Sequence, residues 1–447
     1  MPRVGAPRLR RGGHRDSHSL STSQLVEHFF RHEYGRLVAT LARRVGVEHL
    51  ETVEDAVQAA LMAALESWTV AGLPDNPSGW LFRVAHNELL GELRTRSHRR
   101  RILEQYANEE AAAENGPEPL LTGEVQDDLL RMLFVCCDEA IPVESQMVVA
   151  LKTLCGFNIR EIALRLFTSE ANVYKRLGRA RSRLRELPRR TNVTLDQYSS
   201  RLPAVHKILY LLFTEGYLSS HVKTAIRREL CNEAIRLASI LAEHPAGDAP
   251  ETFALLALMH LHAARVAARR DGSGGLLLLE EQDRSLWDRQ QITVGLTWLA
   301  KSAQGDVFSR YHAEAGIAAE HCLAPSFEET RWNEVVECYS LLEQVAPSPI
   351  HKLNRAVAVA EWQGPAAGLA VLEGFEPPTW LASSYLWAAV LADLHRRGGN
   401  ADAANRYRTL ACETAPTPAI KELLQRRLGN GGAAQQGDAP DGASRRR

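Results

Sequence analysis

Apolar residues recur at helical spacing along most of this chain. Between about residues 23 and 101 they stand three or four positions apart, which is the period of an amphipathic α-helix. The pattern predicts a compact bundle of roughly four helices in this part of the chain. The residues that carry it are Leu25, Phe29, Phe30, Leu37, Leu41, Val53, Val57, Leu61, Leu65, Leu81, Val84, Leu89 and Leu93.

The same pattern stops and resumes further along. Residues 104–126 mix acidic residues with alanine, glycine and proline, and they cannot bury enough apolar surface to offset the entropy lost on ordering, so we expect a linker. A small helical unit is expected over 127–190 and a much larger helical region over 200–428. Strand signals are nearly absent. The predicted fold class is therefore all-α.

The two ends of the chain lack this periodicity. Residues 1–22 are rich in Arg, Gly, Ser and His, and residues 429–447 are rich in Gly, Ala and Asp. Such compositions do not support a packed core. We expect a disordered basic arm at the first end and a disordered tail at the second.

The large C-terminal region contains a repeat. Small residues at Gly399, Ala404 and Ala411, followed by Pro416, stand at the offsets of the second helix of a tetratricopeptide unit. Pro347 closes a similar segment about two periods of 34 residues earlier. The repeat predicts an α-solenoid of tetratricopeptide-like (TPR-like) helix pairs as the third domain.

Composition sets the class of protein. A chain of 447 residues, 45% hydrophobic and 24% charged, suggests two to four globular domains. Its seven cysteines include no C-x-x-C pair, which favours a reducing compartment. No apolar run reaches the roughly 18 residues of a membrane helix, and the start lacks the apolar core of a secretory signal. We expect a cytoplasmic protein that is neither exported nor membrane-anchored.

The formal net charge is only -1, but the charged residues are distributed unevenly along the chain. Arginines cluster near 94–101 and 175–190, whereas 104–126 is acidic. Local clusters of this kind, rather than the net charge, decide whether a surface attracts nucleic acid.

The arginine-rich segment near 175 belongs to a helix-turn-helix pattern. A short apolar helix is followed by a break at Phe167 and Thr168 and then by a longer basic helix. Small Ala163 permits a close helix crossing, Thr168 or Ser169 is suited to cap the second helix, and Val173 and Leu177 are expected to pack inward. The polar residues left facing outward are Ser169, Glu170, Asn172, Lys175, Arg176 and Arg179.

This outward face has the chemistry of a DNA-reading surface. Hydroxyl, amide and carboxylate groups at the helix N-terminus suit base edges in a major groove, and the cations further along suit phosphates. The alternative is an ordinary solvated basic helix. The preceding short helix and turn favour DNA binding over that alternative.

The first bundle offers a second surface for nucleic acid. Trp80, Arg83, His86 and Arg94 lie on one predicted helix that ends in a basic cluster. Unpaired bases stack on aromatic rings, and their backbone pairs with arginine, so this helix suits melted DNA. Trp80 could equally belong to the buried core.

The order of these elements resembles a known family. "VEDAVQAALMAALESW" followed by "WLFRVAHNELLGELR" is similar to the second conserved region of sigma-70-type factors, and the helix-turn-helix resembles their fourth region. Residues 23–103 thus resemble sigma region 2 and residues 127–190 sigma region 4. The segments "ILYLLFTEGYLSS", "RRELCNEAIRLASIL" and "LLLLEEQDRSLWDRQQI" resemble the helical extension of one subgroup of extracytoplasmic-function (ECF) sigma factors.

The resemblance implies contacts with core RNA polymerase and promoter DNA. It assigns Asp55, Gln58, Leu61 and Met62 to the β′ clamp helices, and region 4 to the β flap; the alternative for the first set is an ordinary amphipathic helix. It assigns the recognition helix to the minus-thirty-five element. It assigns contacts with the minus-ten element to the loop at 73–77 and to Asn76, Trp80, Asn87, Arg94 and Arg96. Family members commonly have aspartate where this chain has Gly91, which costs about 1 kcal/mol of helix propensity.

The extension contains an unusual cluster, Asp283, Arg284, Trp287 and Asp288, after a glycine turn and an apolar run. Tryptophan and arginine are common in binding hot spots, so the cluster is a candidate docking element. A buried structural tryptophan with satisfied ion pairs is the other interpretation. The resemblance implies that the extension takes the place of a separate anti-sigma protein and regulates activity, with a partner protein as its first candidate ligand.

The sequence favours other functions less strongly. The chain has no phosphate-cradling glycine loop, no nucleophile elbow and no metal-spaced Cys/His set, so we expect no enzyme activity, cofactor or metal. Histidines such as His206, His260 and His262 are expected to be surface or core residues. A one-component regulator with a sensing solenoid remains the main rival, and a pure scaffold is another. The N-terminal bundle argues against an operator-binding regulator, which has no use for it.

Overall fold

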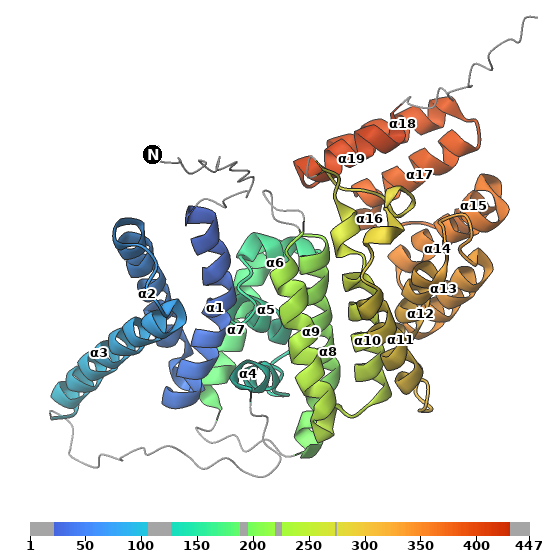
Figure 1. Cartoon of the computed structure of the whole chain (residues 1–447). Coiled ribbons are helices and arrows are strands. Elements are labelled where there is room, and N and C mark those ends of the chain that lie inside the picture. Colours follow the sequence, from blue (N-terminus) through green and yellow to red (C-terminus); the bar gives the residue numbers. More distant parts are fainter. Residues whose placement is uncertain (1–21, 106–126, 188–194, 220–225, 273–274, 430–447) are drawn as a thin grey trace, which may run out of the picture.

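The computed structural model describes residues 22–105, 127–187, 195–219, 226–272 and 275–429. In these ranges the chain forms α-helices and short 3-10 turns without any strand, so the all-α prediction is confirmed there. The N-terminal helices α1–α3 lie at one end of the molecule and α17–α19 at the other (Figure 1). The expected basic arm, the acidic part of the linker and the C-terminal tail lie outside the described residues.

The N-terminal bundle consists of three long helices rather than four. They are α1 (Thr22–Val45), α2 (Leu50–Ala71) and α3 (Pro77–Gln105). The apolar positions from Leu25 to Leu41 fall on the single helix α1, which accounts for the difference. Val53, Val57 and Leu81 are fully buried where these helices meet.

A second helical unit follows. It contains α4 (Asp128–Cys136), α5 (Val143–Thr153), α6 (Ile159–Arg165) and α7 (Glu170–Glu186). Asp127 caps α4 by accepting a hydrogen bond from the backbone nitrogen of Leu130 at 2.9 Å. The α4 and α5 helices are buried along most of their length, because α1 and α8 (Leu195–Tyr217) cover α4, and α7 and α8 cover α5.

The extension begins with long helices and continues as shorter hairpins. Its first half contains α8 (Leu195–Tyr217), α9 (Arg228–Glu243), α10 (Pro250–Ala263), α11 (Arg289–Ser302) and α12 (Arg310–Leu323). Its second half contains α13 (Trp332–Val345), α14 (Pro349–Gln363), α15 (Pro365–Leu372), α16 (Thr379–Ala382), α17 (Tyr385–Arg397), α18 (Ala401–Glu413) and α19 (Pro418–Leu428).

The predicted repeat corresponds to real helix pairs. Pro347 and Pro416 each follow the end of a helix, α13 and α18. Gly399 adopts φ of +79° in the tight turn between α17 and α18, a conformation that a side chain disfavours. Ala411 is fully buried in that hairpin. The pairing is less regular at α15 and α16, which are too short to form a full unit.

The second unit and the extension share one core. The ring of Phe134 on α4 meets the ring of Tyr198 on α8 edge-on, with centroids 4.8 Å apart. Arg201, also on α8 and buried, binds Asp138 at 2.5 Å and donates to the carbonyl oxygen of Phe134. Because α8 completes the core of the second unit, the extension is part of the support for the helix-turn-helix.

The N-terminal bundle touches this combined body closely at α1. A side chain on Gly35 would place its Cβ 1.9 Å from the backbone carbonyl oxygen of Leu154, just after α5. Only glycine permits two backbones to approach so closely. None of the helices in the described ranges is long and apolar enough to cross a lipid bilayer.

We predict that Gly35→Ala lowers the free energy of unfolding by about 1–3 kcal/mol, because the methyl group collides with backbone that cannot move aside cheaply. Gly91→Ala is the matched control. Gly91 also lies within a helix, but a Cβ there meets nothing within 4 Å. The control should gain about 1 kcal/mol from helix propensity. Urea unfolding followed by circular dichroism measures both, and equal effects would contradict the close packing.

Candidate nucleic-acid interface

The helix-turn-helix has a well-capped geometry. Asn158 and Glu161 form a capping box at the start of α6, with bonds of 2.7 and 2.8 Å. Phe167 lies in the turn with φ of +49°, and Ser169 caps α7 by accepting from the backbone nitrogen of Asn172 at 3.3 Å. Val173 is fully buried, and Ala163 and Leu177 nearly so. The predicted cap and inward packing are confirmed.

The outward face of α7 is open in the described structure. Ser169, Glu170, Asn172, Lys175 and Arg179 are exposed. Arg176 is half-buried, because it lies 3.5 Å from Glu144 at the start of α5. The face therefore keeps polar groups at the helix N-terminus and cations further along, as a groove-reading helix requires.

The first helix of this motif is tied to the extension by buried charges. Arg165 on α6 pairs with Glu215 on α8, whose side chain is fully buried. Arg227, just before α9, lies 3.4 Å from Glu161 and 3.5 Å from Glu215. The positive charges of two arginines thus balance the negative charges of two carboxylates at a site shielded from water. None of these pairs was foreseen from the sequence, because the two partners of each pair belong to different elements and stand at least 12 residues apart.

The extension also reaches the turn of the motif. Phe167 packs against Trp380 of α16, with ring centroids 4.8 Å apart. Both rings remain partly exposed, Phe167 at 59% and Trp380 at 37%. A duplex that approached the N-terminus of α7 would therefore come close to α16 as well.

The α3 helix carries an aligned polar stripe. Trp80, Asn87 and Arg94 stand seven residues apart on one continuous helix, so they share a face. Asn87 and Arg94 are exposed, and Gly91 leaves an open gap between them. The side chain of the predicted contact residue Arg96 lies outside the described residues. The stripe offers one aromatic group, one amide and one cation along its length.

Trp80 and Asn76 are positioned by local contacts. Trp80 is half-buried and meets the buried ring of Trp68 edge-on, with centroids 5.5 Å apart. Trp80 therefore packs partly against the core and keeps part of its ring exposed to solvent. Asn76 is exposed, and its side-chain oxygen accepts from the backbone nitrogen of Gly79 at 2.8 Å, which holds the side chain at the start of α3.

The α2 helix presents a different stripe. Asp55, Gln58 and Met62 are exposed, and Met62 has 58% of its surface open. Leu61 is half-buried beside them. An exposed methionine flanked by polar groups is a feature of surfaces that bind protein partners.

The cluster around Trp287 is internal to the extension. Trp287 is only 3% exposed, and the guanidinium groups of Arg284 and Arg265 lie 4.4 and 5.8 Å from its ring centre. Arg284 donates to the carbonyl oxygens at the C-terminal end of α12. Asp283 and Asp288 are exposed and accept backbone bonds that start η5 (Arg284–Leu286) and α11. These contacts favour the structural interpretation over an exposed docking element.

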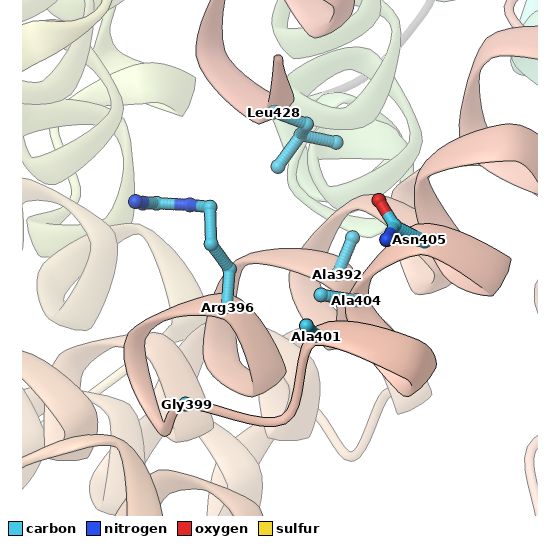
Figure 2. Close-up of a pocket in the computed structure, with 7 residues that line it drawn as sticks. All are labelled: Ala392, Arg396, Gly399, Ala401, Ala404, Asn405 and Leu428. Atoms are coloured by element: carbon cyan, nitrogen blue, oxygen red, sulfur yellow. The ribbon is translucent and has the colours of Figure 1, made fainter. Parts of the chain in front are cut away.

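Other chemistry is weakly represented in the described part of the chain. A pocket of about 140 Å³ lies at the turn between α17 and α18 (Figure 2), and only Arg396 and Asn405 line it with polar side chains.

Burial raises the pKa of Cys137 and Cys155 to about 12, so these thiols stay protonated. His206 and His260 are buried. No three His, Cys, Asp or Glu residues there are grouped to hold a metal ion.

The comparisons with known proteins match three parts of the chain. Residues 30–99 match the family described as Sigma-70 region 2, residues 131–184 match Sigma-70, region 4, and residues 201–303 match a family of unknown function (DUF6596). An uncharacterized protein of Rhizobium meliloti (strain 1021) is 37% identical over 329 residues, which cover 73% of this chain and 77% of that protein. No solved structure matches the chain.

We predict that Arg227→Met destabilises the protein by about 3 kcal/mol, because it removes a cation from a buried charge network. Arg228→Met is the matched control, since Arg228 is the next residue and is exposed. Its effect should stay within about 0.5 kcal/mol. Thermal and urea unfolding measure both variants. Equal stabilities would show that Arg227 does not hold the network together.

Proposed function

Because the chain belongs to the sigma-70 family, as an ECF-type sigma factor with a C-terminal helical extension, we propose a specific role for each of its three parts. Proteins of this family are transcription initiation factors rather than enzymes, and they act with core RNA polymerase at promoters. The observation that carries the proposal is the presence of both sigma regions in one chain, each with its polar face exposed.

The N-terminal bundle is proposed to bind core polymerase through α2. The stripe of Asp55, Gln58 and Met62, with Leu61 at its edge, combines one carboxylate, one amide and an exposed apolar group. Such a mixture fits a protein interface with an apolar centre and a polar rim. By family resemblance, the partner surface is the clamp helices of the polymerase β′ subunit.

The α3 helix is proposed to hold the melted minus-ten element. Trp80 offers a ring face for an unpaired base, and Asn87 and Arg94 follow on the same face for backbone contacts. Asn76 adds the free NH₂ group of its side chain at the N-terminal end of the helix. By family resemblance, Arg96, which lies on α3 two residues after Arg94, is proposed as a further minus-ten contact.

The α7 helix is proposed to read the minus-thirty-five element. Ser169, Glu170 and Asn172 stand at its N-terminus, where a recognition helix meets base edges. Lys175, Arg176 and Arg179 stand further along, where they suit phosphates. By resemblance, the same unit also contacts the polymerase β flap.

The extension is proposed to regulate these activities from within the chain. Supporting this role, it holds the helix-turn-helix through the buried charges around Glu215, and Trp380 lies against its turn. A partner protein that bound the solenoid would act on region 4 through these contacts. Deleting the chain after Arg190 is a poor test, because it also removes Tyr198 and Arg201 from the core of region 4.

The rival function is a one-component regulator that binds an operator without polymerase. Such a protein does not need the exposed stripes of α2 and α3, and it usually dimerises to match a palindrome. The two functions differ in one measurable property, which is whether specific transcription starts require the protein and core polymerase together.

We predict specific transcription starts when this protein is added to purified core polymerase and a promoter library. Start sites sharing minus-thirty-five and minus-ten elements are the expected result of run-off sequencing. In the same system Met62→Asp should lower the affinity for core polymerase about tenfold, because it buries a charge in the interface.

Val70→Asp is the control for that substitution. Val70 is also an exposed apolar residue of α2, at 90% exposure, but it lies off the stripe. It should change core affinity less than about twofold. Operator binding by the protein alone, without polymerase-dependent starts, would support the rival function instead.

We predict that Trp380→Ala strengthens binding of the full-length protein to minus-thirty-five duplex about two- to fivefold, because it clears the turn beside α7. Trp362→Ala is the matched control, since Trp362 is half-exposed on α14 and is not among the ring contacts of the turn. Fluorescence anisotropy with labelled duplex measures both. Weaker binding by Trp380→Ala would mean that α16 supports DNA binding rather than limiting it.

A further inference from the structure

Three arginines lie close together in the first half of the extension. Arg265 follows α10, Arg269 ends η3 (Val266–Arg269) and Arg284 begins η5. All three donate hydrogen bonds to neutral groups. Arg265 donates to the hydroxyl of Tyr217 and to Nδ1 of His262, both at 2.9 Å. Arg269 donates to the carbonyl oxygen of Tyr217, and Arg284 donates to carbonyl oxygens at the end of α12. In the described ranges, none of the three arginines forms an ion pair with a carboxylate.

A buried charge normally has an opposite charge at close range, because its removal from water is costly. Arg265 is only 7% exposed and lacks such a partner. Asp283 and Asp288 are near in sequence, but they are exposed and accept backbone hydrogen bonds instead. Burial and then the charge of Arg265 lower the pKa of Arg284, and the exposed Glu328 opposes them only weakly. Nearby carboxylates therefore do not balance the positive charge of this cluster.

The histidine beside the cluster is subject to the same positive charge. Burial, and after it the charges of Arg265 and Arg284, lower the pKa of His321 on α12 to about 3. His321 is therefore neutral at physiological pH. An anion beside the two arginines would offset the charge that acts on this ring.

Buried donor atoms without an acceptor lie around the same arginines. Nε of Arg265, Nη2 of Arg284 and Nε1 of Trp287 are buried and have no hydrogen-bond partner in the described part of the chain. The guanidinium groups of Arg265 and Arg284 lie 5.8 and 4.4 Å from the ring centre of Trp287, so the three donors surround one indole ring. In folded proteins such donors are almost always paired with protein groups, water or an ion. Because guanidinium and indole N–H groups are donors only, their partner must be an acceptor.

The chemistry of these donors selects the class of ligand. A metal cation is excluded, because the cluster is positively charged and offers N–H groups rather than lone pairs. An oxyanion supplies both a negative charge and several acceptor atoms, and guanidinium groups match the geometry of phosphate and carboxylate. Arg284 is half-exposed, so solvent reaches the cluster from its side.

We propose that this cluster is a binding site for a small oxyanion, a phosphate or carboxylate group that accepts hydrogen bonds from Arg265, Arg284 and Trp287. The site lies where the end of α8 meets α10 and α12, because Tyr217 and His321 belong to its surroundings. None of its residues lies on α2, α3 or α7. It is therefore a ligand site of the extension itself, additional to the surfaces proposed for polymerase and DNA.

Equilibrium dialysis of the full-length protein against labelled inorganic phosphate tests the site. Sodium chloride keeps the ionic strength constant during the titration. We expect one phosphate per chain with a Kd of about 1 mM or tighter. Unlabelled acetate serves as the competitor. Displacement of phosphate by acetate at similar concentrations identifies a carboxylate site, and displacement only at far higher concentrations identifies a phosphate site.

Arg265→Gln should weaken phosphate binding about tenfold or more, because it removes the most buried charge of the cluster. Arg289→Gln is the matched control. It removes the same charge two residues after Trp287, but Arg289 is exposed at the start of α11. The control should change the affinity less than about twofold, because salt screens an exposed charge. Circular dichroism shows whether each variant keeps its helical fold.

Arg284→Gln is a second route to the same result, because it removes a charge from the half-exposed side and leaves Arg265 in place. It should also weaken phosphate binding about tenfold. If both site variants bind phosphate as tightly as the control, phosphate binds elsewhere on the chain and the site is refuted. Absence of binding by the unsubstituted protein below about 10 mM phosphate would overturn it as well, since water alone would then complete the buried donors.

Discussion

Four charged side chains meet in the interior between the helix-turn-helix and the extension. Arg165 and Arg227 supply two cations, and Glu161 and Glu215 supply two carboxylates. A charge removed from water needs a partner at close range, and removing one partner costs several times more than losing an exposed pair. The helix-turn-helix and the first helices of the extension are therefore one body, and the ring contact between Phe134 and Tyr198 joins the same two parts.

The joint between this body and the N-terminal bundle has a different character. Most of its ion pairs are partly exposed, and its closest backbone approach depends on the missing side chain of Gly35. Glu233 illustrates the balance at this joint. Burial alone would raise its pKa, but hydrogen bonds from Arg236 and Arg36 outweigh that effect and lower the pKa. These ion pairs surround an apolar core, because buried side chains of α1 and α2 belong to the same hydrophobic cluster as those of α4 and α5.

Much of the candidate site could be predicted because it depends on local patterns. The spacing of Val173 and Leu177 fixed which side of α7 faces inward, and Ser169 was a foreseeable cap. The seven-residue spacing of Trp80, Asn87 and Arg94 likewise places them on one face of any continuous helix. The cluster around Trp287 shows the limit of such reasoning. Its residue types suit a binding hot spot and a buried core equally well, and burial alone separates the two.

The helical class of the chain, its order of elements and the outward faces of α3 and α7 could be predicted from the amino-acid sequence alone. These properties follow from residue spacing within single helices, where each neighbour is only a few positions away. Which helices meet is a property of the tertiary structure. It paired Glu51 with Arg185 and Glu54 with Arg181 across more than 120 residues, and it placed Trp380 against Phe167. Ion pairs and ring contacts between distant segments produce no regular spacing in the sequence. The residues around one partner therefore do not reveal which distant residue it contacts.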